Sequence, residues 1–310
     1  MNEFSTHPLY GKHNLDSAMS SLWRFYTKKL ISLFILSFAM SLVVQIISSN
    51  LKFTEVQTIS DPTEMLDMLK SMIWPIILIS LISLFFTVIL SYYIIYNPVD
   101  EDKNILTCIV NSLKYYIPYL IIVVIFAFLA SFALLLGLLA LIVGVFFAAL
   151  YVGMIYLFIL PVLLAEGTNI GHVINRTVIL AHRNFWSNMG WVAVFVLILM
   201  VISIVTSALL LLPFTGSFIK VMTNPTEAEH LVQITTSPVY IVLSSLISAF
   251  YFPLMPILGV ILYFNGRARE EEVTDNTPAD DQDNNRLKIE DLYANPDAGD
   301  NTDDQDNSES

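Results

Sequence analysis

Arginine pairs stand beside apolar runs at two places in the sequence, and they are the residues best suited to hold another molecule. Arg267 and Arg269 directly follow the last apolar run, and Arg176 and Arg183 lie in a short amphipathic stretch. Guanidinium groups at the edge of an apolar run anchor its end and attract anionic lipid headgroups. These four arginines are therefore the candidate contacts to lipid headgroups or to a protein partner.

One acidic residue stands close to these arginines in the sequence. Glu166 and Gly167 close another apolar run, so Gly167 is expected to end a helix. The Glu166 carboxylate is expected to pair with Arg176 or Arg183. The predicted role of this dipeptide is structural.

Metal binding and thiol chemistry are not indicated. His172 and His182 are ten residues apart and project from different faces of one helix, whereas metal-binding histidines favour a spacing of about four. Cys108 is the only cysteine, and in its apolar stretch it is expected to be a small buried side chain. With no catalytic, cofactor-binding or metal-binding motif in view, we expect a protein that is not an enzyme and needs no cofactor.

Composition points to a membrane protein. Of the 310 residues 55% are hydrophobic and only 14% are charged, whereas soluble proteins carry about 25% charged residues. Residues 265–310 hold 15 acidic and 4 basic side chains, so nearly all of the net charge of −12 belongs to this tail, which is predicted to be disordered. No basic patch with interleaved aromatic residues indicates a nucleic-acid partner.

Six segments are long and apolar enough to cross a bilayer as helices of about 20 residues. Residues 117–165 contain no Asp, Glu, Lys, Arg or His across 49 positions, roughly 73 Å of helix, so this run must fold back. Gly137 and Gly144 bracket the expected reversal. The runs are continuous rather than alternating, which favours helices over a β-barrel. The sequence thus predicts an all-α polytopic membrane helix bundle with spans at 30–48, 72–96, 117–136, 143–164, 189–212 and 239–264.

The distribution of Lys and Arg predicts the orientation of these spans. Lys52, Lys70 and Lys220 fall on one side, and the other 12 of the 15 basic residues fall on the opposite side. Because Lys and Arg stay with the cytoplasm, both termini are expected there. The predicted organisation is a cytoplasmic N-terminal segment, a transmembrane domain and a cytoplasmic tail, at residues 1–29, 30–264 and 265–310.

An amphipathic stretch precedes each pair of spans. The three stretches begin at Leu15, Ile105 and Ile170, with apolar residues three and four positions apart. On the cytoplasmic face such helices would lie in the headgroup plane and bend into the next span. Two outer loops add a shared helix-start signal, at Asp61–Glu64 and Asn224–Glu227. We interpret the pattern as three units of elbow helix plus hairpin, a threefold repeat.

The span interiors contain prolines and serines but no ionisable residue. Pro75, Pro161, Pro253 and Pro256 predict kinks, and the two close prolines of the last span are candidates for a hinge or a cavity wall. Ion-coupled transporters usually need ionisable groups inside the membrane, so their absence argues against that class. The serines suit close helix packing, or a polar path for an uncharged or lipidic substrate.

Two stretches resemble a bacterial family. The first is Pro-Val-Leu-Leu-Ala-Glu-Gly at Pro161–Gly167, followed by Asn184-Phe-Trp186, and the second runs from Pro256 through Tyr263 to Arg-Ala-Arg-Glu at Arg267–Glu270. Together they resemble the six-span YciC-like or "glycerophosphoryl diester phosphodiesterase membrane domain" proteins over roughly residues 10–272. The resemblance implies a bacterial cytoplasmic membrane protein. The phosphodiesterase activity belongs to relatives fused to a separate catalytic domain, and this chain has only loops and a tail outside the membrane.

We therefore expect a non-enzymatic membrane protein that organises the envelope or its lipids, or that scaffolds partners. Its expected partners are the bilayer, anionic phospholipid headgroups and other membrane proteins. The alternative is a transporter or channel for a neutral or amphiphilic solute, which predicts a through-going cavity lined by Ser and Thr. A lipid-active enzyme would need clustered Asp, Glu or His at the membrane surface.

Overall fold

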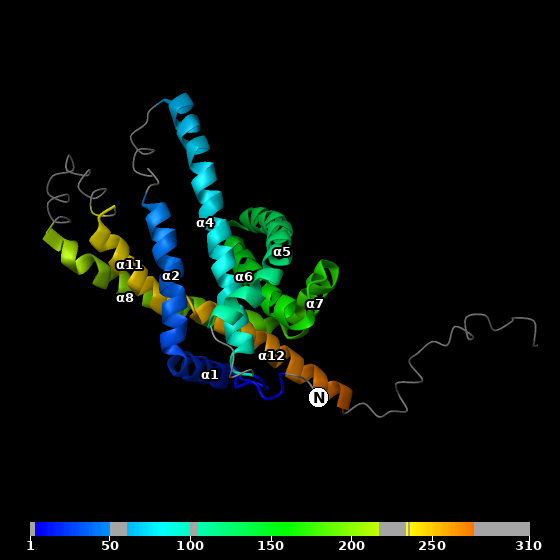
Figure 1. The fold of residues 1–310 in the computed structure, drawn as a ribbon. Coiled ribbons are helices and arrows are strands. Elements are labelled where there is room, and N and C mark those ends of the chain that lie inside the picture. The colour runs from blue at the N-terminus through cyan, green and yellow to red at the C-terminus, as the bar shows by residue number, and fades with distance from the viewer. Residues whose placement is uncertain (1–3, 50–60, 100–104, 217–233, 235, 276–310) are drawn as a thin grey trace, which may run out of the picture. The chain divides into compact units, whose positions relative to one another are not determined.

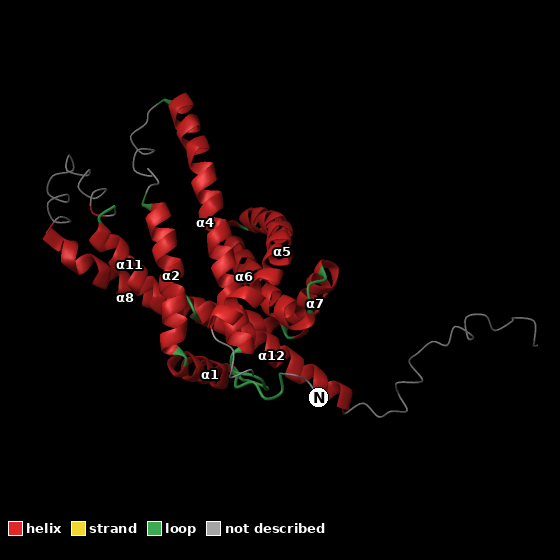
Figure 2. Ribbon diagram, in the orientation of Figure 1, coloured by secondary structure: helices red, strands yellow, loops and turns green. Residues whose placement is uncertain are grey.

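The computed structural model of the chain describes residues 4–49, 61–99, 105–216, 234 and 236–275. Over these residues every regular element is a helix (Figure 2), and six helical runs are long and apolar enough to cross a membrane. The predicted all-α polytopic bundle is confirmed. Residues up to Ala268 form one compact unit, and Arg269 begins a second. The helices are α1 (Leu15–Lys28), α2 (Leu30–Ser48), α4 (Pro62–Tyr96), α5 (Ile105–Leu139), α6 (Leu141–Glu166), α7 (Ile170–Arg183), α8 (Phe185–Leu211), the 3₁₀ turn η1 (Leu212–Phe214), α11 (Pro238–Tyr251) and α12 (Leu254–Asp275) (Figure 1).

The long uncharged run folds back where expected. Ala140 alone separates α5 from α6, and Leu141 adopts a positive φ of 60°. The two helices approach closely because Gly137 and Gly144 face each other: a Cβ on Gly137 would lie 2.8 Å from the Gly144 carbonyl oxygen. The predicted reversal between these glycines is confirmed.

Two of the three expected amphipathic helices are separate elements. Asn14 caps α1 and Asn169 caps α7, each through a side-chain oxygen that accepts a backbone N–H. The backbone leaves the helical conformation at Lys29 and at Asn184, so each elbow turns into the next span. The stretch that begins at Ile105 has no such break and continues directly into the span within α5. The elbow-plus-hairpin unit is therefore regular only in the first and third units.

Helix α4 begins at the predicted signal and extends beyond the membrane. The Asp61 side chain accepts the Thr63 N–H at 2.9 Å, and Pro62 is the first helical residue. Its 35 residues span about 52 Å, more than the about 30 Å of a hydrocarbon core, so its first turns lie outside the core. Exposed Asp67 and Lys70 pair there at 2.8 Å. The matching signal at Asn224–Glu227, like the tail beyond residue 275, lies outside the described residues.

The last span consists of two helices. Helix α11 ends at Tyr251 and α12 begins at Leu254, so the predicted hinge at Pro253 is a break. A break leaves carbonyl groups without a helical donor, which is costly in lipid. The hydroxyl of Tyr26, from α1, donates to the Phe250 carbonyl at 2.7 Å and satisfies one of them.

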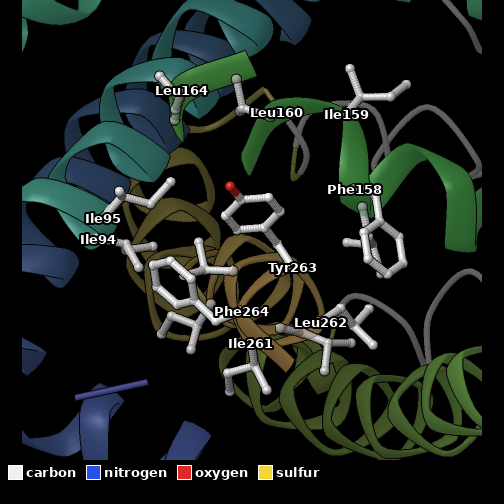
Figure 3. Close-up of a cluster of buried hydrophobic side chains, with 14 of the residues drawn as sticks. Ile94, Ile95, Phe158, Ile159, Leu160, Leu164, Ile261, Leu262, Tyr263 and Phe264 are labelled. Carbon is white, nitrogen blue, oxygen red and sulfur yellow. The ribbon is translucent and has the colours of Figure 1, made fainter. Parts of the chain in front are cut away.

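The last span also forms the centre of the bundle. In its most apolar window 56% of the residues are buried, against 6% for α5 and for α8. Figure 3 shows Tyr263 and Phe264 of α12 among side chains of α4 and α6. Apolar side chains at the far turn of α5 and α6 are open instead, with Ile142 87% exposed. Soluble proteins rarely expose so large a contiguous apolar surface, so these side chains are suited to contact with the acyl chains of a bilayer.

The small-residue packing predicted for the spans occurs in part, between α2 and α11, which lie side by side (Figure 1). Small polar side chains are buried on both helices, so their backbones approach closely. These residues are Ser37, Ser41, Ser244, Ser245 and Ser248. Several other serines of the spans are exposed instead, namely Ser80, Ser131, Ser203 and Ser207.

Candidate functional site

Glu166 is the centre of a polar cluster at one end of the bundle. It is the last residue of α6, and Gly167, with φ 107°, ends the helix as predicted. The Arg176 Nε donates to both carboxylate oxygens of Glu166, at 2.9 Å and 3.2 Å. The side chains of Glu166 and Arg176 are only 12% and 17% exposed. The expected pairing of Glu166 with an arginine of α7 is confirmed, and Arg176 is the partner.

Three further groups complete this Glu166 cluster. The Tyr263 hydroxyl donates to Glu166 Oε1 at 3.1 Å, and Arg267 Nη1 lies 3.7 Å from the same oxygen. His172 Nε2 lies 3.1 Å from Oε2. One carboxylate thus joins the end of α6 to the middle of α12 and to the amphipathic helix α7. A carboxylate whose two oxygens are both engaged in this way is suited to anchoring helices rather than to accepting a substrate proton.

Polar contacts bring the other span ends to the same end of the bundle. Lys29 Nζ, between α1 and α2, donates to Asn97 Oδ1 after α4 at 2.8 Å. The His13 backbone N–H donates to Asn265 Oδ1 in α12 at 2.9 Å. The segments that the charge distribution predicts to be cytoplasmic therefore meet at one end of the helices.

The N-terminal segment packs into this end. Phe4, His7 and Leu9 are buried, and the His7 ring lies 4.8 Å from the ring of Phe264, centre to centre. His7 Nδ1 accepts the Leu9 N–H at 3.1 Å, so Nε2 carries the hydrogen and donates to the Ile94 carbonyl at 3.0 Å. Burial lowers the pKa of His7 to about 4, against a smaller opposing effect of the Ile94 hydrogen bond. Sequence reasoning missed this residue, although Phe4 and Leu9 are apolar.

The four predicted arginines are only partly brought together. Arg176 and Arg267 share Glu166. Arg183 lies two turns after Arg176 on α7, and Arg269 belongs to the second compact unit. Tyr263 lies one turn before Arg267 on α12. Sequence reasoning did not place it in the site, because its position near a span end was the only feature that set it apart.

The two histidines of α7 have different surroundings, as predicted. His172 contacts Glu166, whereas His182 Nδ1 donates to the Val178 carbonyl at 2.8 Å and its Nε2 lies 3.2 Å from the Tyr151 hydroxyl. No group of three His, Cys, Asp or Glu that could hold a metal ion occurs among the described residues. Cys108 is buried, as expected.

No family model, curated protein or solved structure matches this chain. The site is therefore interpreted from its own chemistry. It combines two guanidinium groups, a carboxylate that holds them, and an amphipathic helix at one end of a membrane-spanning bundle.

Proposed function

We propose that this protein is a non-enzymatic membrane protein that organises lipids at one membrane face, where its arginines bind anionic phospholipid headgroups. The proposed contacts are Arg176, Arg183, Arg267 and Arg269, and other membrane proteins are proposed as further partners. We also propose membership of the YciC-like six-span family and a place in the bacterial cytoplasmic membrane with both termini inside. The charge distribution and the motifs at Pro161–Gly167 and Arg267–Glu270 support both assignments.

The observation that carries the proposal is the placement of α1 and α7. Each packs one face on the buried core while it keeps large apolar side chains open on another face: Trp23 on α1 is 41% exposed, and Val178 and Ile179 on α7 are 41% and 45% exposed. A helix that rests on a protein core and also offers apolar side chains outward suits the boundary between headgroups and acyl chains. Arg24 and Arg176 on these two helices would then lie at headgroup depth.

The Glu166 cluster supports the same function. By binding both Arg176 and Arg267, Glu166 holds two guanidinium groups close to each other at the end of the last span. Basic groups near a membrane surface each add about 1 kcal/mol of attraction to anionic lipids, and fixed guanidinium groups can bind a phosphate in a bidentate manner. The arrangement therefore favours phosphate-bearing headgroups over zwitterionic surfaces.

Native mass spectrometry of the full chain tests this proposal. The protein is released from nanodiscs that contain equal amounts of phosphatidylglycerol and phosphatidylcholine, and the retained lipids are counted. We expect preferential retention of phosphatidylglycerol, which Arg183→Gln combined with Arg267→Gln reduces. Lys70→Gln, which removes a positive charge from the distant first turns of α4, serves as the matched control. Equal retention of the two lipids by the unaltered protein would contradict the proposal.

A second candidate is a transporter or channel for a neutral or amphiphilic solute. It is favoured by one observation, a cavity within the membrane-spanning part that Thr87 and Ser91 help to line. Flux of labelled glycerol into proteoliposomes tests it, and a rate equal to that of protein-free liposomes would count against it.

A further inference from the structure

A cavity of about 320 Å³ lies between α4, α5 and α6 on one side and α8 with the break of the last span on the other. This volume falls at the lower end of the range of about 300–1,000 Å³ that small-molecule sites occupy. At about 1.5 Å per residue, Ser91 lies about 8 Å before the end of α4, and Tyr156 about 15 Å before the end of α6. The cavity is therefore at the depth of acyl chains, and none of its lining residues is charged.

Ser91 presents an unused hydroxyl to this cavity. Its side chain is buried, with 2% exposure, yet it forms no hydrogen bond with any residue in the part of the chain that the structure describes. Thr87, one turn earlier on the same wall, instead donates to the Ser83 carbonyl at 2.7 Å. A hydroxyl that faces an apolar cavity within the bilayer gains little from leaving its hydrogen-bonding capacity unused, so Ser91 favours a guest that carries an oxygen.

A tyrosine pair offers a second polar contact. The Tyr119 hydroxyl donates to the Tyr156 hydroxyl at 2.9 Å. Two hydroxyls hold two hydrogens and their mutual bond uses one, so the pair keeps one hydrogen for a guest. Among the described residues neither hydroxyl has another partner. The other hydroxyls of the lining, those of Thr87 and Tyr251, already have protein partners, so Ser91 and the tyrosine pair supply the polar contacts that the lining offers to a guest.

Helix-breaking residues shape this cavity. Pro161 has no N–H, so the Leu157 carbonyl lacks its usual helical donor. Gly259 of α12 lies against that carbonyl, because a Cβ at Gly259 would lie only 2.7 Å from the Leu157 oxygen. Pro256, one of the two prolines considered as candidates for a hinge or a cavity wall, also lines the cavity, whereas Pro253 does not. The close contact of α6 with α12 forms one wall, and Phe252 and Met255, beside the break of the last span, form another.

We infer that this cavity binds an uncharged single-chain lipid that carries an oxygen acceptor, such as a long-chain alcohol or a monoacylglycerol. The acyl or alkyl chain lies along the apolar wall. The guest's oxygen accepts a hydrogen bond from the tyrosine pair and forms a second hydrogen bond with the Ser91 hydroxyl. An ionised headgroup is excluded because the wall supplies no counter-charge. This site does not depend on the proposed binding of anionic headgroups at the surface.

Photolabelling of the full chain tests the inference. The protein is placed in phosphatidylcholine nanodiscs with a hexadecanol analogue that carries a diazirine next to its hydroxyl group, and labelled peptides are mapped. We expect saturable labelling around Ser91 and Tyr156 that unlabelled hexadecanol displaces and hexadecyl phosphate does not. Labelling that grows linearly with probe concentration would show bulk lipid contact only, and equal displacement by hexadecyl phosphate would show a charge-tolerant site. Either result overturns the inference.

Two conservative substitutions locate the polar contacts. Ser91→Ala combined with Tyr156→Phe removes both hydroxyls, keeps the apolar wall, and is expected to weaken hexadecanol displacement about tenfold. Matched controls are Ser80→Ala, on the exposed face of α4, and Tyr240→Phe in α11, away from the cavity; both are expected to bind as the unaltered protein does. Unchanged displacement in the double variant overturns the inference. Should that variant fail to fold, the contrast between hexadecanol and hexadecyl phosphate on the unaltered protein still decides.

Discussion

Acid should release the N-terminal segment from the bundle, because His7 is buried in its neutral form. Its pKa is lowered to about 4 by burial, from 6.5 in water. Because the neutral form of His7 is the one that is buried, its lowered pKa means that His7 contributes its full stabilisation of the fold above pH 6.5. That stabilisation is lost as the pH falls from 6.5 towards 4. Protonation also removes the Nδ1 lone pair that accepts the Leu9 N–H.

The size of the effect follows from the two pKa values. At about 1.4 kcal/mol per pKa unit, full protonation would cost roughly 3 kcal/mol, and the loss between pH 7.5 and pH 5 is about 2 kcal/mol. The assay is the free energy of unfolding in mild detergent at these two pH values. We expect the unaltered protein to lose about 2 kcal/mol more than His7→Gln, which cannot be protonated and can still donate to the Ile94 carbonyl.

His182→Gln is the matched control, because His182 is exposed on α7 and should leave the pH dependence unchanged. If the unaltered protein and His7→Gln lost the same stability on acidification, the buried neutral histidine would not be the cause and the reasoning would be refuted.

Three further predictions concern other parts of the bundle. Gly137→Ala should lower the free energy of unfolding by about 1–3 kcal/mol, because its Cβ would lie 2.8 Å from the Gly144 carbonyl oxygen. The control is Gly153→Ala, whose Cβ would meet nothing within 4 Å, and equal unfolding free energies of the two variants would contradict the close approach of α5 and α6. Thr177→Val should raise the free energy of unfolding by about 1 kcal/mol, because the buried Thr177 hydroxyl has no partner among the described residues. A lower free energy of unfolding would contradict this and would indicate that a water or lipid oxygen in the adjacent 200 Å³ cavity binds the hydroxyl. Glu166→Gln should cost about 2 kcal/mol, and a double-mutant cycle with Arg176→Gln should show coupling between the two residues; additive losses would argue against the pair.

Local properties of the sequence were sufficient to predict the spans and part of the site. Apolar length and the absence of charge define the helices, and the glycines near residue 140 define the reversal. The pairing of Glu166 with Arg176 could also be predicted, because Arg176 follows ten positions after Glu166, in the short amphipathic helix that comes next in the chain. Tyr263 and Arg267 could not be added to the cluster, because their meeting with Glu166 depends on how α12 packs against α6.

Other features could not be predicted because they depend on context. The second elbow merges with its span although Pro118, a residue that often ends or kinks a helix, stands at their junction. An amphipathic pattern alone does not mark a helix boundary. The burial of His7 depends on a short segment that fills the end of the bundle, and seven residues with two or three apolar positions show no usable periodicity. The unused hydroxyl of Ser91 differs from its neighbours only in what surrounds it.

The hydrogen bond from Tyr26 to the Phe250 carbonyl links a surface helix to a joint in the central one. Lateral tension or thinning of a bilayer acts first on helices that lie in its plane, and α1 has the amphipathic character of such a helix. The Tyr26 hydroxyl therefore ties α1, beside its apolar packing on the core, to the point where the last span is broken.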